Sequence, residues 1–260
     1  MALVAVSPHL DDAALSASVN LHGVGATVLT VFAGMPPPGL TASLWDRFTG
    51  ASTSAQRQAE RLAEDKAVMS LLSARGSYLD EREVQYRQAE PAPDLDRLAG
   101  RIAEHLTGAD EVWLPAAIGG NPDHVLARDA GLRAAAATGH RDVMLYADFP
   151  YVIAYGWPAW VSGQPADPYL DPEIWLAEQF AAAGLDAPVR SAEVITLSSA
   201  QRAAKAEIIA AYRSQASALG LTAAALTREP SKLDYELCWR ITVAAVQAES
   251  ADGTPAAIHR

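Results

Sequence analysis

The sequence predicts an α/β protein in which helices cover both faces of a mostly parallel, Rossmann-like sheet. Short apolar runs alternate along the chain with longer helix-forming segments, as in proteins built from β-α-β units. Half of the 260 residues are hydrophobic, which is enough for a buried core. Alternation of this kind gives parallel strands with right-handed crossovers, and therefore helices on both faces of the sheet.

The first predicted unit is a β-α-β unit. Residues 2–7 form a short apolar run and residues 26–33 form another that is rich in β-branched side chains, which predicts two buried strands. Between them, residues 12–22 carry small and apolar side chains at helical spacing. Asp11 and Asp12 are well placed at the N-terminus of that helix.

A long helix is predicted over residues 54–74, because strong helix formers predominate there. We expect its apolar face to pack on the sheet, with the charged positions on the opposite face. The residues of the expected apolar face are Leu62, Val68, Met69, Leu71 and Leu72.

The alternation continues through the rest of the chain. The further predicted elements are a helix over about 93–106, a strand over 110–118, a helix over about 124–138, a strand over 142–148, a strand near 189–197, a helix over about 198–218 and an amphipathic piece around 231–247. Two Pro-rich segments, 34–50 and 149–173, are too long for minimal connections, and such loops usually carry function. We expect a single domain over residues 1–249 and a frayed tail over 250–260.

Composition excludes several classes of protein. Twenty Lys and Arg against 31 Asp and Glu give a net charge of −11, which repels phosphate backbones and anionic lipids, so neither nucleic acid nor a membrane is an expected partner. No apolar run approaches the roughly 18 residues that cross a bilayer, and the opening MALVAVSPHLDD has no basic leader, which predicts a cytoplasmic protein. The single cysteine, Cys238, excludes a disulfide within the chain and a thiolate zinc site.

Two polar clusters follow predicted strands. His9, Asp11 and Asp12 come directly after the first strand, and the second cluster, 119–124, follows the strand over 110–118 and ends in His124. Ligands bind at the carboxyl ends of strands in open parallel sheets, so adjacent crossovers would bring the two clusters together.

The residue types in the two clusters suit a metal ion. His9, Asp12 and His124 match the usual catalytic count of three protein ligands and one open position. Taken singly, each cluster is equally well explained by carboxylates that cap helices and by incidental histidines. Two such clusters in a chain with only six histidines favour the metal site.

Other hydrolytic chemistries lack their motifs. The chain contains neither a G-x-S-x-G elbow nor a phosphate-binding G-x-x-x-x-G-K sequence. The fragment Gly23-Val24-Gly25 precedes a predicted strand instead of following one, which argues against a dinucleotide site. Cys238 lies in an apolar stretch and is expected to be buried and inert.

At these motifs the sequence resembles the PIG-L/LmbE-like metal-dependent N-deacetylases, whose pattern is a strand followed by His-x-Asp-Asp and a later x-x-Asp-His element. The resemblance covers most of the chain and implies their three-layer fold. The segments that carry it are SPHLDDAALS, GGNPDHVLARDA, FAGMPP, WD, RQAERLAEDKAVMSLL, YLDEREVQYR, YADFPY, KAEIIAAYRSQ and YELCWR.

The resemblance also implies roles for the clustered residues. His9, Asp12 and His124 would bind one zinc ion per chain, although the same donors suit iron, cobalt or nickel. Asp11 would be the general base that takes a proton from the zinc-activated water, and Asp123 would orient a histidine ligand. The products would be acetate and a free amine.

Asn121 departs from the family pattern, because many members carry a histidine there that is thought to stabilise the oxyanion or protonate the leaving amine. Asn cannot act as an acid, but its amide can donate a hydrogen bond to an oxyanion. This departure keeps two interpretations open: an enzyme with a weakened or altered protonation step, and an inactive protein that binds a metabolite or regulates a partner.

The resemblance points to a small N-acylated substrate, most simply an N-acetylated amino sugar or a specialised metabolite. Asp148 and Tyr151 follow the strand over 142–148, and we place both in the substrate pocket. A turn that begins at Asp148 and an aromatic side chain packed in the core explain them equally well. Trp45, Trp157 and Trp160 lie in the long loops, where they could stack on a sugar or act as hydrophobic lids. The sequence contains no signal for an oligomeric state.

Overall fold

The computed structural model describes residues 2–88, 90–154, 161, 172–183, 187 and 189–243. Its centre is a seven-stranded sheet with the order β3-β2-β1-β4-β5-β7-β6. The strands are β1 Leu3–Ser7, β2 Thr27–Thr30, β3 Arg75–Tyr78, β4 Glu111–Pro115, β5 Asp142–Tyr146, β6 Val189–Thr196 and β7 Tyr235–Thr242. The five strands from β3 to β5 are mutually parallel, whereas β7 runs antiparallel to both β5 and β6.

The strand order reverses at β1. This strand pairs with β2 on one side, where Val4 lies opposite Thr27, and with β4 on the other side, where Val4 lies opposite Val112. The carboxyl ends of β1 and β4 therefore lie next to each other at the switch point of the sheet, which is where open α/β sheets bind ligands.

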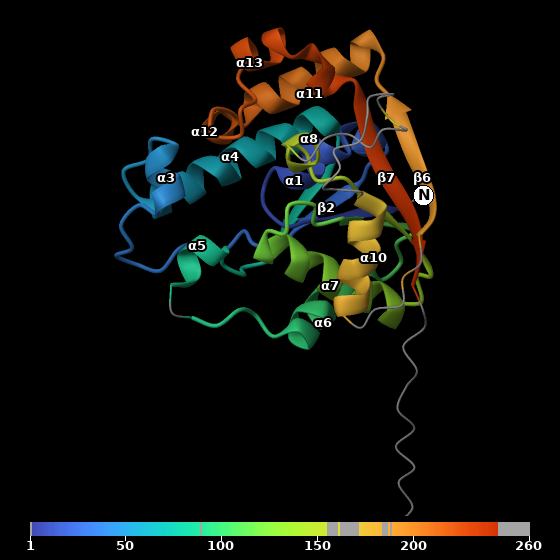
Figure 1. Ribbon diagram of the computed structural model, residues 1–260. Coiled ribbons are helices and arrows are strands. Elements are labelled where there is room, and N and C mark those ends of the chain that lie inside the picture. Colours follow the sequence, from blue (N-terminus) through green and yellow to red (C-terminus); the bar gives the residue numbers. More distant parts are fainter. Residues whose placement is uncertain are drawn as a thin grey trace, which may run out of the picture.

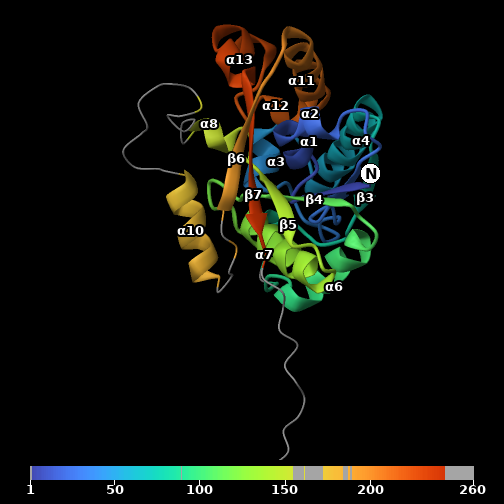
Figure 2. The same ribbon diagram turned by 90° about the vertical axis from the view of Figure 1, so that its right-hand side faces the viewer.

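Helices cover both faces of the sheet (Figures 1 and 2). One layer contains α1 Asp12–Ser16, α2 Ser18–Leu21, α4 Ser54–Leu72 and α11 Ser199–Ala211. The opposite layer contains α6 Leu95–Leu106, α7 Pro122–Ala137 and α10 Pro172–Ala182. The shorter helices are α3 Leu44–Phe48, α5 Val84–Arg87, α8 Tyr151–Ala154, α12 Arg213–Ala216, α13 Ala223–Arg228 and the 3-10 helix η1 Pro230–Leu233.

Each face of the sheet has its own hydrophobic core, because successive residues of a strand point to opposite faces. Val4 and Val6 of β1 belong to the core under α6 and α7. Leu3 and Ala5 belong to the core under α1 and α4. The buried run of β1 is what a central parallel strand requires, since both of its faces are covered.

The predicted fold class is confirmed, and most predicted elements are present with shifted ends. The helix expected over 12–22 is broken at Ala17, and the helix expected over 198–218 is broken at Tyr212. The amphipathic piece near the C-terminus is a strand, β7, inserted between β5 and β6. The edge strand β3 and the short helices α3, α5 and α13 were not predicted.

The prediction that α4 buries an apolar face and exposes its charged residues is wrong in part. Arg61, Glu64 and Asp65 are buried, whereas Leu71 is 40% exposed. The reason is that the buried side of this helix faces other polar groups: Arg61 pairs with Glu83, and Asp65 accepts hydrogen bonds from two tyrosines.

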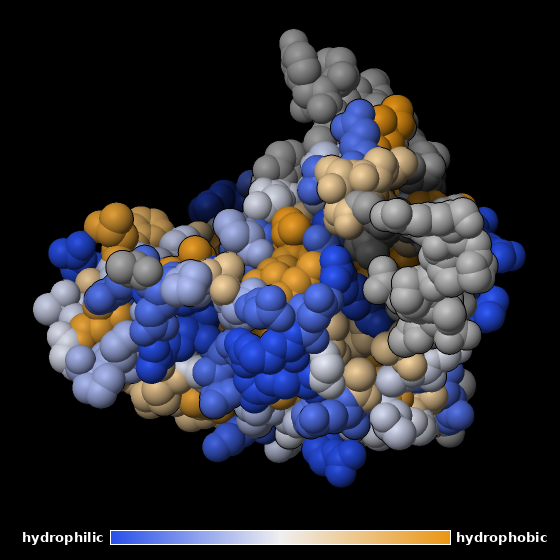
Figure 3. Space-filling view, turned by 90° about the horizontal axis from the view of Figure 1, so that it is seen from below, coloured by the Kyte–Doolittle hydropathy of each residue, from blue (hydrophilic) through white to orange (hydrophobic). Residues whose placement is uncertain are grey.

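Other expectations concern the surface and the ends of the chain. Figure 3 shows small, separate hydrophobic groups within a largely hydrophilic face, and among the described helices none is long and apolar enough to cross a membrane. Cys238 is buried, as expected. Trp157, Trp160 and the tail predicted over 250–260 lie outside the described residues.

Candidate active site

The site lies where three parallel strands end. The chain leaves β1 through His9 and enters α1 at Asp12, and it leaves β4 through a turn that enters α7 at Pro122. The end of β5 supplies Asp148. The clusters that are far apart in the sequence therefore meet at one edge of the sheet.

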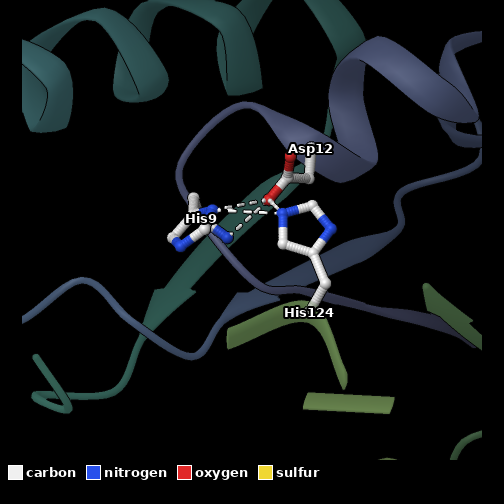
Figure 4. A group of neighbouring side chains, drawn as sticks. All are labelled: His9, Asp12 and His124. Atoms are coloured by element: carbon white, nitrogen blue, oxygen red, sulfur yellow. Dashed lines mark hydrogen bonds and ion pairs between the residues drawn. The ribbon is translucent and has the colours of Figure 1, made fainter. Parts of the chain in front are cut away.

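His9, Asp12 and His124 converge on one point (Figure 4). Asp12 Oδ2 lies 3.2 Å from His9 Nδ1 and 3.2 Å from His124 Nε2, and the two nitrogens are 3.3 Å apart. Around a tetrahedral ion with bonds of about 2.0–2.1 Å, neighbouring ligand atoms lie about 3.3–3.4 Å apart. The three side chains are therefore spaced as ligands of one small divalent metal ion.

Carboxylates hold the outer nitrogens of both histidines. His9 Nε2 is 3.2 Å from Asp123 Oδ2, and His124 Nδ1 is 2.7 Å from Asp148 Oδ1. A ring nitrogen that donates to a carboxylate leaves the opposite nitrogen free for a metal and fixes the orientation of the ring. Each of the two histidines thus has the partner that histidine ligands ordinarily have.

The structure corrects the expectation that Asp148 lines the substrate pocket. Its side chain is fully buried behind His124 and also accepts a hydrogen bond of 3.0 Å from the Ile118 amide. Asp148 is not among the residues that line the pocket described below. Its position at the end of β5 aims it at the histidine and not at solvent.

The electrostatics of the cluster favour a cation. Burial lowers the pKa of His124, but Asp12 and Asp148 outweigh that effect and raise it to about 9. Burial likewise lowers the pKa of His9, while Glu83, Asp12 and Asp123 raise it well above its usual value. Carboxylates that stabilise positive charge on both rings would also stabilise a metal ion, so the donor set and its charge fit a divalent metal.

Asp123 is itself fixed from two sides. Its Oδ2 accepts a hydrogen bond of 2.8 Å from the Val84 amide, and its Oδ1 lies 2.8 Å from Arg87 of α5. The pKa of Asp123 is lowered, because His9, Val84 and Arg87 together outweigh its burial. This carboxylate therefore stays ionised beside His9.

A pocket of about 270 Å³ opens beside the three candidate ligands. Asp11 lies on its wall and makes no capping hydrogen bond to α1 with its side chain. Burial and the neighbouring Asp12 raise the pKa of Asp11 to about 6, although Arg61 and His9 lower it. A carboxylate with such a pKa can take up a proton near neutral pH.

The pocket also contains residues that the sequence singled out. Trp45 lies on its wall, where its indole nitrogen donates a hydrogen bond of 2.9 Å to Gln215 Oε1. Tyr151 and Asn121 line the pocket as well. Asn121 is the N-cap of α7, and its Oδ1 accepts a hydrogen bond of 2.9 Å from the Asp123 amide.

Several residues of the pocket wall were not predicted from the sequence, and three of them are polar residues that form an ion pair or a hydrogen bond there. Arg61 of α4 and Glu83 form a buried ion pair on the pocket wall, and Gln215 of α12 binds Trp45. Arg61 and Gln215 lie on predicted helices, where a polar residue ordinarily faces solvent. The only signal for Glu83 was its place in the segment YLDEREVQYR, which contributes to the family resemblance.

No family model matches the chain. A 2'-N-acetylparomamine deacetylase from Streptomyces fradiae is 34% identical to it over an alignment that covers 56% of this chain and 56% of the relative. The chain thus spans little more than half the length of this curated relative.

Solved deacetylases have the same fold. Teicoplanin deacetylase in a zinc-inhibited form superposes with a TM-score of 0.72 and 23% identity, over 95% of this chain and 100% of that one. The A40926 pseudoaglycone deacetylase superposes with a TM-score of 0.67 and 25% identity, over 94% and 98% of the two chains. The resemblance to the PIG-L/LmbE-like N-deacetylases that the motifs indicate is thus confirmed.

Proposed function

We propose that this chain is a zinc-dependent N-deacetylase that hydrolyses the N-acetyl amide of a small molecule containing an amino sugar, releasing acetate and a free amine. The observation that carries the proposal is the convergence of His9, Asp12 and His124, each histidine backed by a carboxylate, on a pocket that also contains Asp11. This is a hydrolytic site with three protein ligands and an accessible base.

We infer that His9, Asp12 and His124 hold one zinc ion per chain. The two nitrogens and one carboxylate oxygen suit zinc, and they also suit iron, cobalt or nickel. When bound, the metal would lower the pKa of water and polarise the amide carbonyl. Asp123 and Asp148 would keep both rings oriented toward the ion.

Asp11 would act as the general base. It accepts the proton of the attacking water and afterwards gives it to the leaving nitrogen. Its pKa of about 6 is high enough for the carboxylate to accept a proton and low enough for it to be largely ionised at neutral pH. Asp12, next to it in the chain, has a pKa well below its usual value, because the effects of His124 and His9 exceed that of burial, and it stays ionised as a ligand.

The walls of the pocket support a sugar-containing substrate. The indole of Trp45 offers a flat apolar surface, and the ion pair of Arg61 and Glu83 offers charged hydrogen-bonding groups nearby. Such a mixture of aromatic and polar groups is suited to the hydroxyls and apolar face of a sugar ring. The similar proteins are deacetylases of 2'-N-acetylparomamine, of teicoplanin and of the A40926 pseudoaglycone, which supports a small N-acetylated molecule as the substrate.

The alternative of an inactive binding protein rested on Asn121. The intact Asp11 and the complete set of candidate ligands favour an enzyme instead.

Acetate release is the direct test of the activity. The protein would be stripped with a chelator, reloaded with one equivalent of zinc, and assayed on N-acetylglucosamine, N-acetylparomamine and an N-acetylglucosaminyl phenol. Excess zinc is a separate arm, since a relative of this fold has a zinc-inhibited form. We expect release that depends on added metal; a metal-loaded protein that releases no acetate from any of the three compounds would contradict the proposal.

A further inference from the structure

Tyr151 is held in one orientation beside the candidate ligands. Its ring meets that of His124 edge to face, at 5.5 Å between centroids and 88° between planes. On another side it packs on Gly119, where a Cβ atom would lie 3.4 Å from three atoms of Tyr151. Gly119 has φ +96°, so the turn after β4 needs glycine here for its backbone as well.

Asn121 is a hydrogen-bond partner of the Tyr151 hydroxyl. The Asn121 Oδ1 atom accepts a hydrogen bond from the Asp123 amide, and the Nδ2 group of the same side chain is a donor that can serve Tyr151. The side-chain hydrogen bond between Asn121 and Tyr151 lowers the pKa of the phenol, as expected when the amide donates to the phenol oxygen. The proton of Tyr151 is then free to be donated to a third group.

The pocket beside the candidate ligands offers a place for that third group. Tyr151 and Asn121 both line the pocket that contains Asp11 and the ligand His9. A phenol ordinarily has a pKa of about 10, so the hydroxyl carries its proton at neutral pH and can donate it in a hydrogen bond. A neutral donor fixed beside a cation site is suited to an oxygen that becomes negatively charged during a reaction.

We propose that the Tyr151 hydroxyl, held by Asn121 and Gly119, is a catalytic hydrogen-bond donor to the amide oxygen of the substrate. The inference rests on the proposed deacetylase function. It also assigns a role to Asn121, which holds the donor and does not itself supply a proton.

The chemical step is balanced without a further reactant. The water oxygen bonds to the acetyl carbon while Asp11 takes the water proton, and the carbonyl electron pair moves onto the amide oxygen. Tyr151 donates a hydrogen bond to this oxygen and keeps its proton. When the carbon–nitrogen bond breaks, its electron pair stays on nitrogen, which receives the proton from Asp11; acetic acid leaves and ionises in solvent.

Tyr151→Phe tests the proposal, because it keeps the ring against Gly119 and His124 and removes only the hydroxyl. We expect kcat to fall by about 10²-fold with KM changed by less than about twofold, and with unchanged zinc content. Tyr235→Phe, at the start of β7 and outside the pocket, is the matched control and should match the parent.

A binding measurement separates catalysis from a structural role. A methylphosphonamide of glucosamine imitates the tetrahedral intermediate, and the product glucosamine does not. By calorimetry on the zinc-loaded protein, Tyr151→Phe should weaken phosphonamide binding by about the factor lost in kcat and leave glucosamine binding unchanged. In the Tyr151→Phe protein, adding Asn121→Ser, which retains a capping side chain, should cause little further loss of kcat.

The outcomes distinguish this inference from the function on which it rests. If the parent is active and Tyr151→Phe retains its kcat, or changes only KM, the catalytic role of Tyr151 is wrong while the deacetylase function stands. A zinc-loaded parent that neither releases acetate nor binds the phosphonamide overturns both.

Discussion

Asp11 and Asp12 are neighbours in the chain, yet their environments shift their pKa values in opposite directions. Burial next to an ionised neighbour raises the pKa of Asp11 to about 6. Asp12 is equally buried, but its Oδ2 accepts a hydrogen bond of 2.8 Å from the His9 amide and faces both imidazoles, and its pKa is lowered. Paired carboxylates with opposite shifts are typical of sites where one binds and the other moves protons.

Asp11→Asn separates these two roles. Because Asp11 is not one of the converging ligands, we expect the variant to bind zinc with the stoichiometry of the parent. Its kcat/KM for acetate release should fall by about 10²–10⁴-fold, since an amide cannot accept the water proton. An Asp11→Asn protein with the rate of the parent would remove Asp11 as the base.

Asp148→Asn tests the partner of His124. The amide cannot both accept from the Ile118 amide and hold the imidazole as a carboxylate does, so zinc affinity should fall by about 10–100-fold. The control is Asp96→Asn, whose side chain is 79% exposed in a surface ion pair with Arg133. Competition with a chromophoric chelator measures the zinc affinity of both variants. Equal affinity in the two variants would show that Asp148 does not support His124 as a ligand.

Among the individual residues of the site, those that lie directly in motifs could be predicted from the sequence. His9, Asp12 and His124 could be grouped because each cluster follows a strand, and the ends of adjacent parallel strands meet. The position of Asp148 could not be predicted, because whether a residue after a strand points into a pocket or behind a histidine depends on the local turn. Arg61 could not be predicted either, since its burial depends on Glu83, which lies in a loop.

At the scale of elements, α7 connects the site to the sheet. Asn121 caps its N-terminus and Pro122 occupies its first turn, which together set the entry of the helix beside His124. About two turns beyond His124, Gly131 lets the helix approach β4 closely. A Cβ atom at Gly131 would lie 2.6 Å from Leu114 Cδ2. The position of His124 thus depends on close packing of α7 against the sheet.

Gly131→Val should therefore destabilise the protein. The added side chain would meet Leu114, which is fully buried, and we expect the free energy of unfolding to fall by about 1–3 kcal/mol. Gly100→Val is the matched control in α6, because a Cβ at Gly100 has no atom within 4 Å; it should change the free energy by less than about 0.5 kcal/mol. Urea unfolding compares the variants, and equal effects would contradict the close approach.

Most long elements were predictable from helix-forming composition and from apolar runs, whereas β3, α3 and α10 were not. β3 has the sequence RGSY, with one exposed and three half-buried residues, so it lacks the apolar signal of a central strand. It is an edge strand, paired on one side with β2. The breaks at Ala17 and Tyr212 depend on tertiary contacts, such as the bond from the Tyr212 hydroxyl to Asp65.

At the scale of the whole molecule, Asp65 joins three parts of the chain. It lies on α4 and accepts hydrogen bonds of 2.8 Å from Tyr78 of β3 and from Tyr212 between α11 and α12. Burial raises its pKa to about 7, although both tyrosines lower it. The folded protein therefore binds this proton more tightly than the unfolded chain, whose Asp pKa is about 4.

The sign of the pH dependence follows from this shift. The contribution of Asp65 to stability is full below the pKa of the unfolded chain and is lost as the pH rises through about 7. Between about pH 5 and 8, the free energy of unfolding of the parent should fall by on the order of 2–3 kcal/mol relative to that of Asp65→Asn, which does not titrate. Urea unfolding of both proteins in the presence of a chelator, at pH 5 and at pH 8, measures this change. If the difference in free energy of unfolding between parent and variant were the same at both pH values, the raised pKa of Asp65 would be contradicted.

Metal stoichiometry is the decisive property of the proposed site, because the proposed function needs an ion held by His9, Asp12 and His124. Elemental analysis would compare the zinc-reconstituted parent with His124→Ala and with His22→Ala, which replaces an exposed histidine of the same chain. We expect about one zinc per chain in the parent and in His22→Ala, and little in His124→Ala. Equal zinc in all three proteins, or none in the parent, would contradict this expectation.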